Sequence, residues 1–87
     1  MLVIEAILGN VGDDARLGEL ERQLRATGRA ETVELTPAEA QKGRLRTSTD
    51  KGTPLGISLG RGTIVRDGDV LYLHEPEGRM IVPRLKP

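Results

Sequence analysis

The chain contains no cysteine, no phenylalanine and no tryptophan, and Tyr72 is its only tyrosine. Without cysteine it has no disulfide framework, no thiolate metal site and no cysteine nucleophile. Its 13 basic and 13 acidic side chains cancel, so the chain as a whole has no electrostatic attraction to nucleic acid or anionic lipid. A length of 87 residues is enough for one modest core, and we expect a single domain over residues 1–87.

Long hydrophobic runs are also missing. The apolar stretch 2–8 is interrupted by Glu5 and is not preceded by a basic segment. It is too short for a secretory signal or a membrane span. We therefore expect a cytoplasmic protein with no membrane association.

The apolar residues present are mostly Leu, Ile, Val and Ala, and 11 glycines and five prolines turn the chain, a composition that favours short strands. Three leucines at helical spacing predict a helix that is capped by Asp13 or Asp14, ends before Gly28 and contributes little to the core. Residues 36–39 form a capping box that starts a short helical turn. The predicted strands are 2–8, 31–35, 44–49, 55–59, 63–65, 70–73 and 79–82, with Pro83 ending the last one.

These elements predict a mainly β fold: a small two-sheet sandwich or partly open barrel of six to seven short strands with one short surface helix. Turns with a structural role are expected at Gly52 and at Asp67-Gly68-Asp69. The glycines near residue 60 lack the lysine and serine of a phosphate-binding loop, so we interpret them as turn residues too.

The sequence gives little support for catalysis or for tight metal binding. His74, the only histidine, has Glu75 and Glu77 beside it, but no serine lies in a nucleophile context, so we expect no enzyme and no catalytic residue. A tight nickel or zinc site needs three or four ligands. We expect no cofactor and no metal ligand. His74 allows only weak nickel binding, shared with a second chain.

Basic side chains outnumber acidic ones from Arg44 onward, and Arg44 and Arg46 share one face of a predicted strand. With Arg61 and Arg66 they form a candidate partner-binding surface, or an ordinary solvated face. A small nucleic-acid-binding barrel is an alternative. Nucleic acid is the less favoured partner, because sheets that bind RNA usually stack bases on several aromatic side chains.

The block 44–72, RLRTSTDKGTPLGISLGRGTIVRDGDVLY, resembles the N-terminal domain of the urease accessory protein UreE family. The matching features are a basic strand, an alternating segment at 55–59 and a Gly-Asp-Val-Leu ending at 68–71, and the start MLVIEAILGNV is similar as well. The helical stretch 14–27 is longer than the usual connection in that family.

The resemblance implies a β-domain that acts as a non-enzymatic, chaperone-like protein-binding module in the maturation of a metalloenzyme such as urease, including nickel insertion. Its partner would be the metalloenzyme apoprotein or another accessory factor. The family's second, ferredoxin-like domain carries the nickel-binding histidine and the dimer interface, and no residues here correspond to it. The family's metal ligands are therefore not carried over to His74, and the oligomeric state stays open.

Overall fold

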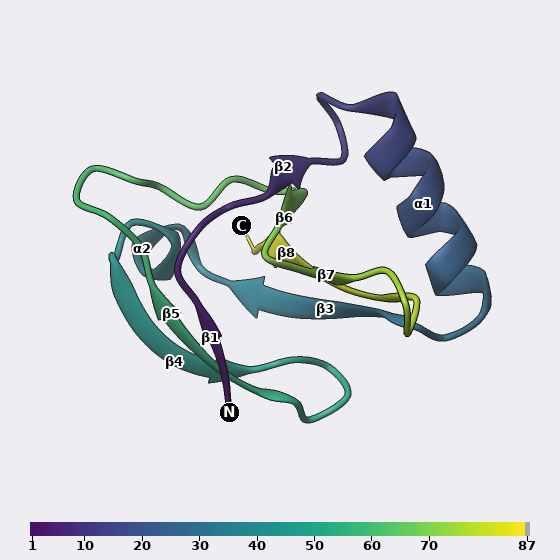
Figure 1. Cartoon of the computed structure of the whole chain (residues 1–87). Helices are drawn as coiled ribbons and strands as arrows, with labels where there is room; N and C mark the ends of the chain where they lie inside the picture. The colour runs from purple at the N-terminus through teal and green to yellow at the C-terminus, as the bar shows by residue number, and fades with distance from the viewer. Residues whose placement is uncertain (87) are drawn as a thin grey trace.

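The computed structural model describes residues 1–86 and contains eight strands and two helices (Figure 1). The strands are β1 (Leu2–Ile4), β2 (Gly9–Asn10), β3 (Ala30–Leu35), β4 (Arg44–Ser48), β5 (Pro54–Ser58), β6 (Asp69–Val70), β7 (Tyr72–His74) and β8 (Arg79–Leu85). The helices are α1 (Ala15–Ala26) and α2 (Pro37–Ala40). The predicted mainly β fold class is confirmed. Within residues 1–86 the strands form three small sheets, ordered β1-β5-β4, β2-β6 and β3-β8-β7. Neither helix is long and apolar enough to cross a membrane.

The sheet β3-β8-β7 is the middle layer, with α1 on one side and the sheet β1-β5-β4 on the other (Figure 1). Alternate residues of β8 point to opposite sides, as expected for a strand. Ile81 faces the larger hydrophobic cluster, which it shares with β1, β3 and β5, whereas Met80 and Val82 face a smaller cluster with Leu24 of α1. Because Leu24 is the only buried hydrophobic side chain of α1, the helix adds little core, as the sequence predicts.

Local signals begin both helices, and end α1, where the sequence predicts. Asp14 caps α1, because its carboxylate accepts hydrogen bonds from the amides of Arg16 and Leu17. Gly28, after the helix, has φ of 74°. Thr36 and Glu39 form the reciprocal hydrogen bonds of a capping box at the start of α2.

Pro83 does not end the last strand, which corrects the prediction. It is fully buried within β8, which pairs in parallel with β3 as far as Leu85. In a strand the N–H and C=O of one residue point to the same side. The Pro83 carbonyl accepts a hydrogen bond of 3.1 Å from the amide of Gly68, on the side away from β3. The nitrogen of Pro83 therefore also points away from β3, so no hydrogen bond of that ladder is lost.

Two predicted strands are divided and one is absent. Stretch 2–8 gives only β1 before the chain leaves the sheet and pairs again at β2. Stretch 70–73 divides at Leu71, because β6 pairs with β2 and β7 pairs with β8. Stretch 63–65 forms no strand, although Val65 is buried and its amide donates to the carbonyl of Ala40 at 2.9 Å. These differences come from pairing between distant segments, which local alternation does not reveal.

Candidate functional site

The sheet β1-β5-β4 has one side in the core and one in solvent. On the core side lie Leu55 and Ile57 of β5, both buried. The solvent side, called the outer face below, consists of Val3, Arg44, Arg46, Ser48, Pro54, Gly56 and Ser58. Val3 lies opposite Gly56, and Gly56 lies opposite Arg46, so these three residues form one row across the sheet.

The middle of the outer face is apolar. Val3 is 60% exposed, and Met1 lies over Gly56, where an added Cβ would come within 3.2 Å of the Met1 Cε. A shallow open depression of about 470 Å³ is lined by Met1, Val3, Arg44, Leu45, Arg46, Gly56, Ile57 and Ser58. Because Gly56 has no side chain, another side chain can lie directly on this part of the sheet.

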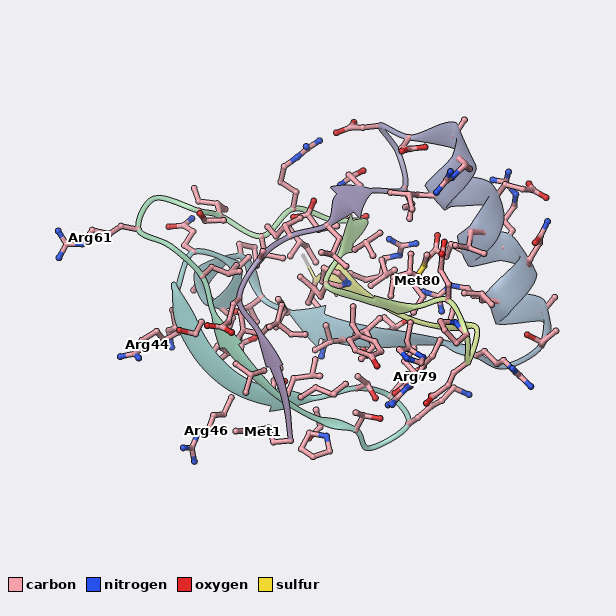
Figure 2. All side chains as sticks on the ribbon, in the orientation of Figure 1. Met1, Arg44, Arg46, Arg61, Arg79 and Met80 are labelled. Atoms are coloured by element: carbon pink, nitrogen blue, oxygen red, sulfur yellow. The ribbon has the colours of Figure 1, made fainter. Side chains whose placement is uncertain are left out.

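Arginines border this apolar patch. Arg44 and Arg46 point outward from β4, and Arg61 projects to the same side of the molecule from the loop after β5 (Figure 2). Within residues 1–86, none of the three takes part in an ion pair. The outer face itself carries no acidic side chain. It thus combines exposed apolar surface with arginines that form no ion pair within residues 1–86.

A second depression of about 400 Å³ lies beside the start of β4, and its lining consists of Gln41, Gly43, Leu59, Arg61, Gly62, Thr63 and Ile64. Ile64 is 55% exposed. The amide of Leu59 donates to the carbonyl of Gly43 at 2.7 Å, which holds the loop against the end of the sheet. Arg61 and Ile64 therefore extend the mixed apolar and basic character beyond the strands.

Arg66, the fourth arginine of the predicted surface, lies apart from this group. Its guanidinium donates to the Asp13 carboxylate at 3.0 Å, next to the turn that leads into α1. The hydrogen bond and the charge of Asp13 raise the pKa of Arg66. The charge of Arg66 is therefore balanced by Asp13. The structure brings together Arg44, Arg46 and Arg61, and it places Arg66 apart from them.

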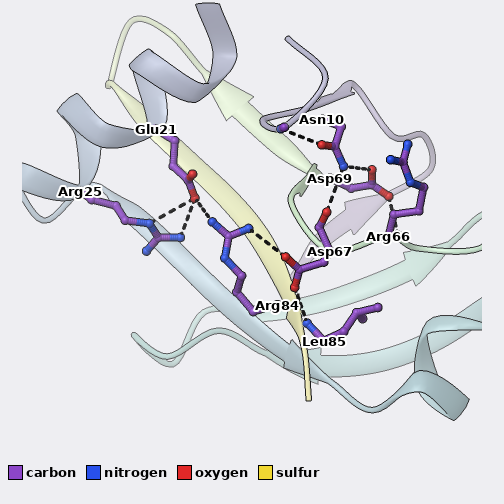
Figure 3. Close-up of polar contacts among 9 residues, drawn as sticks. Asn10, Glu21, Arg25, Arg66, Asp67, Asp69, Arg84 and Leu85 are labelled. Carbon is purple, nitrogen blue, oxygen red and sulfur yellow. Dashed lines mark hydrogen bonds and ion pairs between the residues drawn. The ribbon is translucent and has the colours of Figure 1, made fainter. Parts of the chain in front are cut away.

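The turn 66–69 is held by its own carboxylates (Figure 3). Asp69 accepts from the backbone amide of Arg66 at 2.7 Å and from the side-chain amide of Asn10 at 3.0 Å. Asp67 accepts from the backbone amide of Leu85 at 2.8 Å, which ties the turn to the end of β8. These bonds lie within the fold and leave the two carboxylates engaged with neighbouring strands.

Both predicted turn glycines have backbone angles that favour glycine. Gly68 has φ of 84° and is buried, and Gly52 has φ of 80° in the exposed turn between β4 and β5. Gly68 is also crowded, since a Cβ would come within 3.1 Å of a Val11 methyl group.

Sequence reasoning missed a buried polar cluster between the two larger sheets. Glu31 of β3 is only 4% exposed. It accepts hydrogen bonds from the hydroxyls of Thr49 and Thr53 at 2.7 and 2.6 Å and from the Arg79 guanidinium at 2.6 Å. Burial acts to raise the pKa of Glu31, but the hydrogen bonds from Arg79 and the two threonines outweigh it, so its pKa lies below the ordinary value. A sequence signal existed, because Glu31 alternates in phase with the buried Val33.

His74, at the end of β7, takes part in local contacts. Its Nδ1 accepts a hydrogen bond of 3.3 Å from the amide of Glu77, and its ring stacks on Tyr72 with 6.5 Å between ring centroids. Arg79 lies against the Tyr72 ring as well, 5.7 Å from its centroid. Within residues 1–86 no group of three or more His, Cys, Asp or Glu side chains is placed to hold a metal ion. A nickel site at His74 would still need ligands from a second chain.

Comparison with known proteins gives a family match over almost the whole chain. The family described as UreE urease accessory protein, N-terminal domain, matches residues 4–86. The urease accessory protein UreE of Yersinia aldovae is 40% identical over 85 residues, covering 98% of this chain and 35% of that protein. The urease accessory protein UreE 1 of Pseudomonas syringae pv. syringae (strain B728a) is 38% identical over 73 residues, covering 84% of this chain and 49% of that protein. The chain thus spans between a third and a half of the length of these relatives.

Proposed function

The chain belongs to the family of the UreE urease accessory protein, N-terminal domain, and from this membership we propose that it is a non-enzymatic protein-binding domain that assists the maturation of urease. The proposed partners are the urease apoprotein or another accessory factor. A domain with this role acts through a surface that recognises another protein. The outer face is the surface we assign to it.

The observation that carries this proposal is the combination of Val3 and Met1 with unpaired Arg44 and Arg46 on one side of one sheet. Protein interfaces commonly have an apolar centre, and arginine is enriched in them. Opposite charge on a partner speeds association and fixes its orientation. We therefore expect the partner to present an acidic surface with apolar side chains at its middle.

The proposal is tested by reversing the charge at Arg46. We expect Arg46→Glu to weaken binding to purified urease apoprotein, measured by biolayer interferometry, and to lower urease activity in cells where it replaces the wild type. Arg16→Glu is the matched control, because Arg16 is an exposed arginine on α1 and the change of charge is the same. Equal losses for both variants would mean that only net charge matters. Full binding by Arg46→Glu would remove the outer face as the docking surface.

We further propose that nickel insertion is the step of maturation that the domain assists, through its partner and without a tight nickel site of its own. A single imidazole with nearby carboxylates gives at most a weak site. Calorimetric titration of nickel into the wild type and His74→Ala tests this. We expect no stoichiometric binding by either protein. Micromolar binding that disappears with His74→Ala, together with dimerisation, would replace this proposal with a nickel site shared between two chains.

A further inference from the structure

The edge of β4 carries unpaired backbone groups. β4 is the last strand of the sheet β1-β5-β4 and pairs only with β5. The carbonyl of Gly43 and the amide of Thr49 both bond to the β5 side, to Leu59 and Thr53. Because successive residues of a strand point their backbone groups to opposite sides, the amides and carbonyls of Arg44, Arg46 and Ser48 point to the free edge. Such an edge can accept another strand.

The other sheet edges within residues 1–86 are less suitable. β3 is six residues long, but the turn after β4 already covers it at Thr32. The amide of Asp50 donates to the Thr32 carbonyl at 2.8 Å, and the Thr32 amide donates to the Asp50 carboxylate at 2.9 Å. β1 and β7 have three residues each. The edge of β4 is therefore the longest one that offers an uninterrupted row of backbone groups.

The side chains of β4 indicate what kind of strand would fit. A strand added at this edge would place alternate side chains beside the outer-face residues Arg44 and Arg46, at cross-strand distances where opposite charges attract. Its other side chains would cover Leu45 and Thr47, which are only half-buried at this edge. An occupant with acidic residues alternating with aliphatic ones satisfies both sides.

We propose that the partner docks by adding an extended segment, with alternating acidic and aliphatic residues, to the free edge of β4. This inference rests on the proposed function, because it uses Arg44 and Arg46 of the outer face, and it adds the mode of binding and the chemistry of the partner. A second copy of the chain fits poorly. Pairing two β4 strands would bring their Arg44 and Arg46 side chains close together, and basic residues on an edge oppose self-association.

Amide hydrogen exchange followed by NMR tests the strand addition directly. In the free chain we expect the amides of Arg46 and Ser48 to exchange quickly and those of Leu45 and Thr47 to exchange slowly. The probe is a short synthetic peptide of alternating glutamate and valine. Strand addition predicts that the peptide slows exchange at Arg46 and Ser48 by about tenfold or more. An unchanged alternation in the presence of bound peptide overturns the proposal.

Two changes separate backbone pairing from charge attraction. Ser48→Pro removes an outward amide and keeps both arginines, and proline is tolerated where the N–H faces away from the sheet. N-methylation of alternate peptide amides removes the complementary hydrogen bonds, which the peptide would donate to the outward carbonyls of β4. We expect each change to weaken peptide binding by about tenfold, as loss of one or two hydrogen bonds predicts. If Ser48→Pro lowers the stability of the domain, the affinity of the wild-type chain for the methylated peptide is the deciding measurement.

The outcomes distinguish the two proposals. If both changes leave binding intact while Arg46→Glu abolishes it, the outer face docks a partner by charge alone and strand addition is wrong. If urease apoprotein binds Arg46→Glu and wild type equally, the proposed docking surface fails as well. Binding of a single-stranded oligonucleotide in preference to the acidic peptide, or dimerisation in sedimentation measurements that Ser48→Pro abolishes, would also overturn the strand addition.

Discussion

Replacing Arg79 with methionine tests the buried cluster that joins the two larger sheets. The Arg79 guanidinium donates to the Glu31 carboxylate at 2.6 Å and to the Thr53 hydroxyl at 2.8 Å. Methionine keeps an unbranched apolar side chain about as long as the stem of arginine up to Nε, but it removes both hydrogen bonds and the positive charge. The Glu31 carboxylate then stays buried with only the hydroxyls of Thr49 and Thr53 as donors.

The magnitude follows from the lost contacts. A hydrogen bond to a charged group contributes about 1.5–3 kcal/mol, and a buried charge that loses its partner destabilises a protein by about 3–5 kcal/mol. The Arg79 side chain is 29% exposed, so water replaces part of what is lost and we expect about 3 kcal/mol. For a domain of this size that corresponds to a fall in Tm of about 12–24 °C. It is a large part of the roughly 5–15 kcal/mol that stabilises a typical domain.

The effect also depends on pH. In the wild type the pKa of Glu31 is lowered overall, so its stabilisation is present above the unfolded value of about 4.3 and is lost as pH falls through the folded pKa. In Arg79→Met the hydrogen bond and the charge of Arg79 no longer lower the pKa of Glu31, and we expect this pKa to be higher than in the wild type. The variant then gains stability relative to the wild type as pH falls. The difference between the two proteins should be large at pH 7 and small near pH 3.

Urea denaturation followed by circular dichroism at both pH values measures this difference. The double variant Glu31→Gln/Arg79→Met should be more stable than the sum of the single effects predicts, by about 1 kcal/mol or more. Arg22→Met is the control, because Arg22 forms an exposed ion pair with Glu19 and should leave the unfolding free energy unchanged. A loss for Arg79→Met of the same size at pH 7 and pH 3 would refute the reasoning.

Further substitutions test the turns, the cap and the core, each by urea denaturation at pH 7. Gly68→Ala should destabilise by about 2 kcal/mol and Gly52→Ala by about 1 kcal/mol, because both have positive φ but only Gly68 is crowded. Equal effects would show that crowding at Gly68 is relieved without cost. Thr36→Ala removes the capping-box hydroxyl and should destabilise by about 1 kcal/mol, with Thr36→Ser as its near-neutral control. Leu35→Ala, at a fully buried position, should destabilise by about 2–5 kcal/mol, and a smaller loss would contradict its place in the core.

The parts of the fold that sequence predicts are those with local causes. Asp14, Thr36 and Gly28 act on backbone groups within a few residues, so the helix limits follow from the residues themselves. Parallel pairing of β3 with β8 joins residues about fifty positions apart, and no local sequence pattern indicates it. The place of Pro83 inside β8 depends on which side of the strand is paired, so it could be known only once the neighbours were known.

Only part of the candidate surface could likewise be predicted from the sequence. Alternation in 44–48 places Arg44 and Arg46 on one face, and this follows from strand geometry alone. The separation of Arg66 from that face depends on Asp13, which is 53 positions away in the sequence. The apolar middle of the outer face likewise depends on Val3 being brought beside Gly56 by the parallel pairing of β1 with β5.

The two hydrophobic clusters on opposite sides of the middle sheet have a consequence for how the molecule comes apart. The cluster under α1 has five buried residues, whereas the one between the two sheets has ten and is reinforced by the Glu31 cluster. Detaching α1 breaks the smaller set of apolar contacts and the ion pair between Glu21 and Arg84, so partial unfolding should start there. We expect the outer face to keep its shape during such an event, because the larger cluster beneath it lies on the side of the middle sheet away from α1. We therefore expect motion of the helix away from the sheet to leave the surface that we assign to partner recognition unchanged.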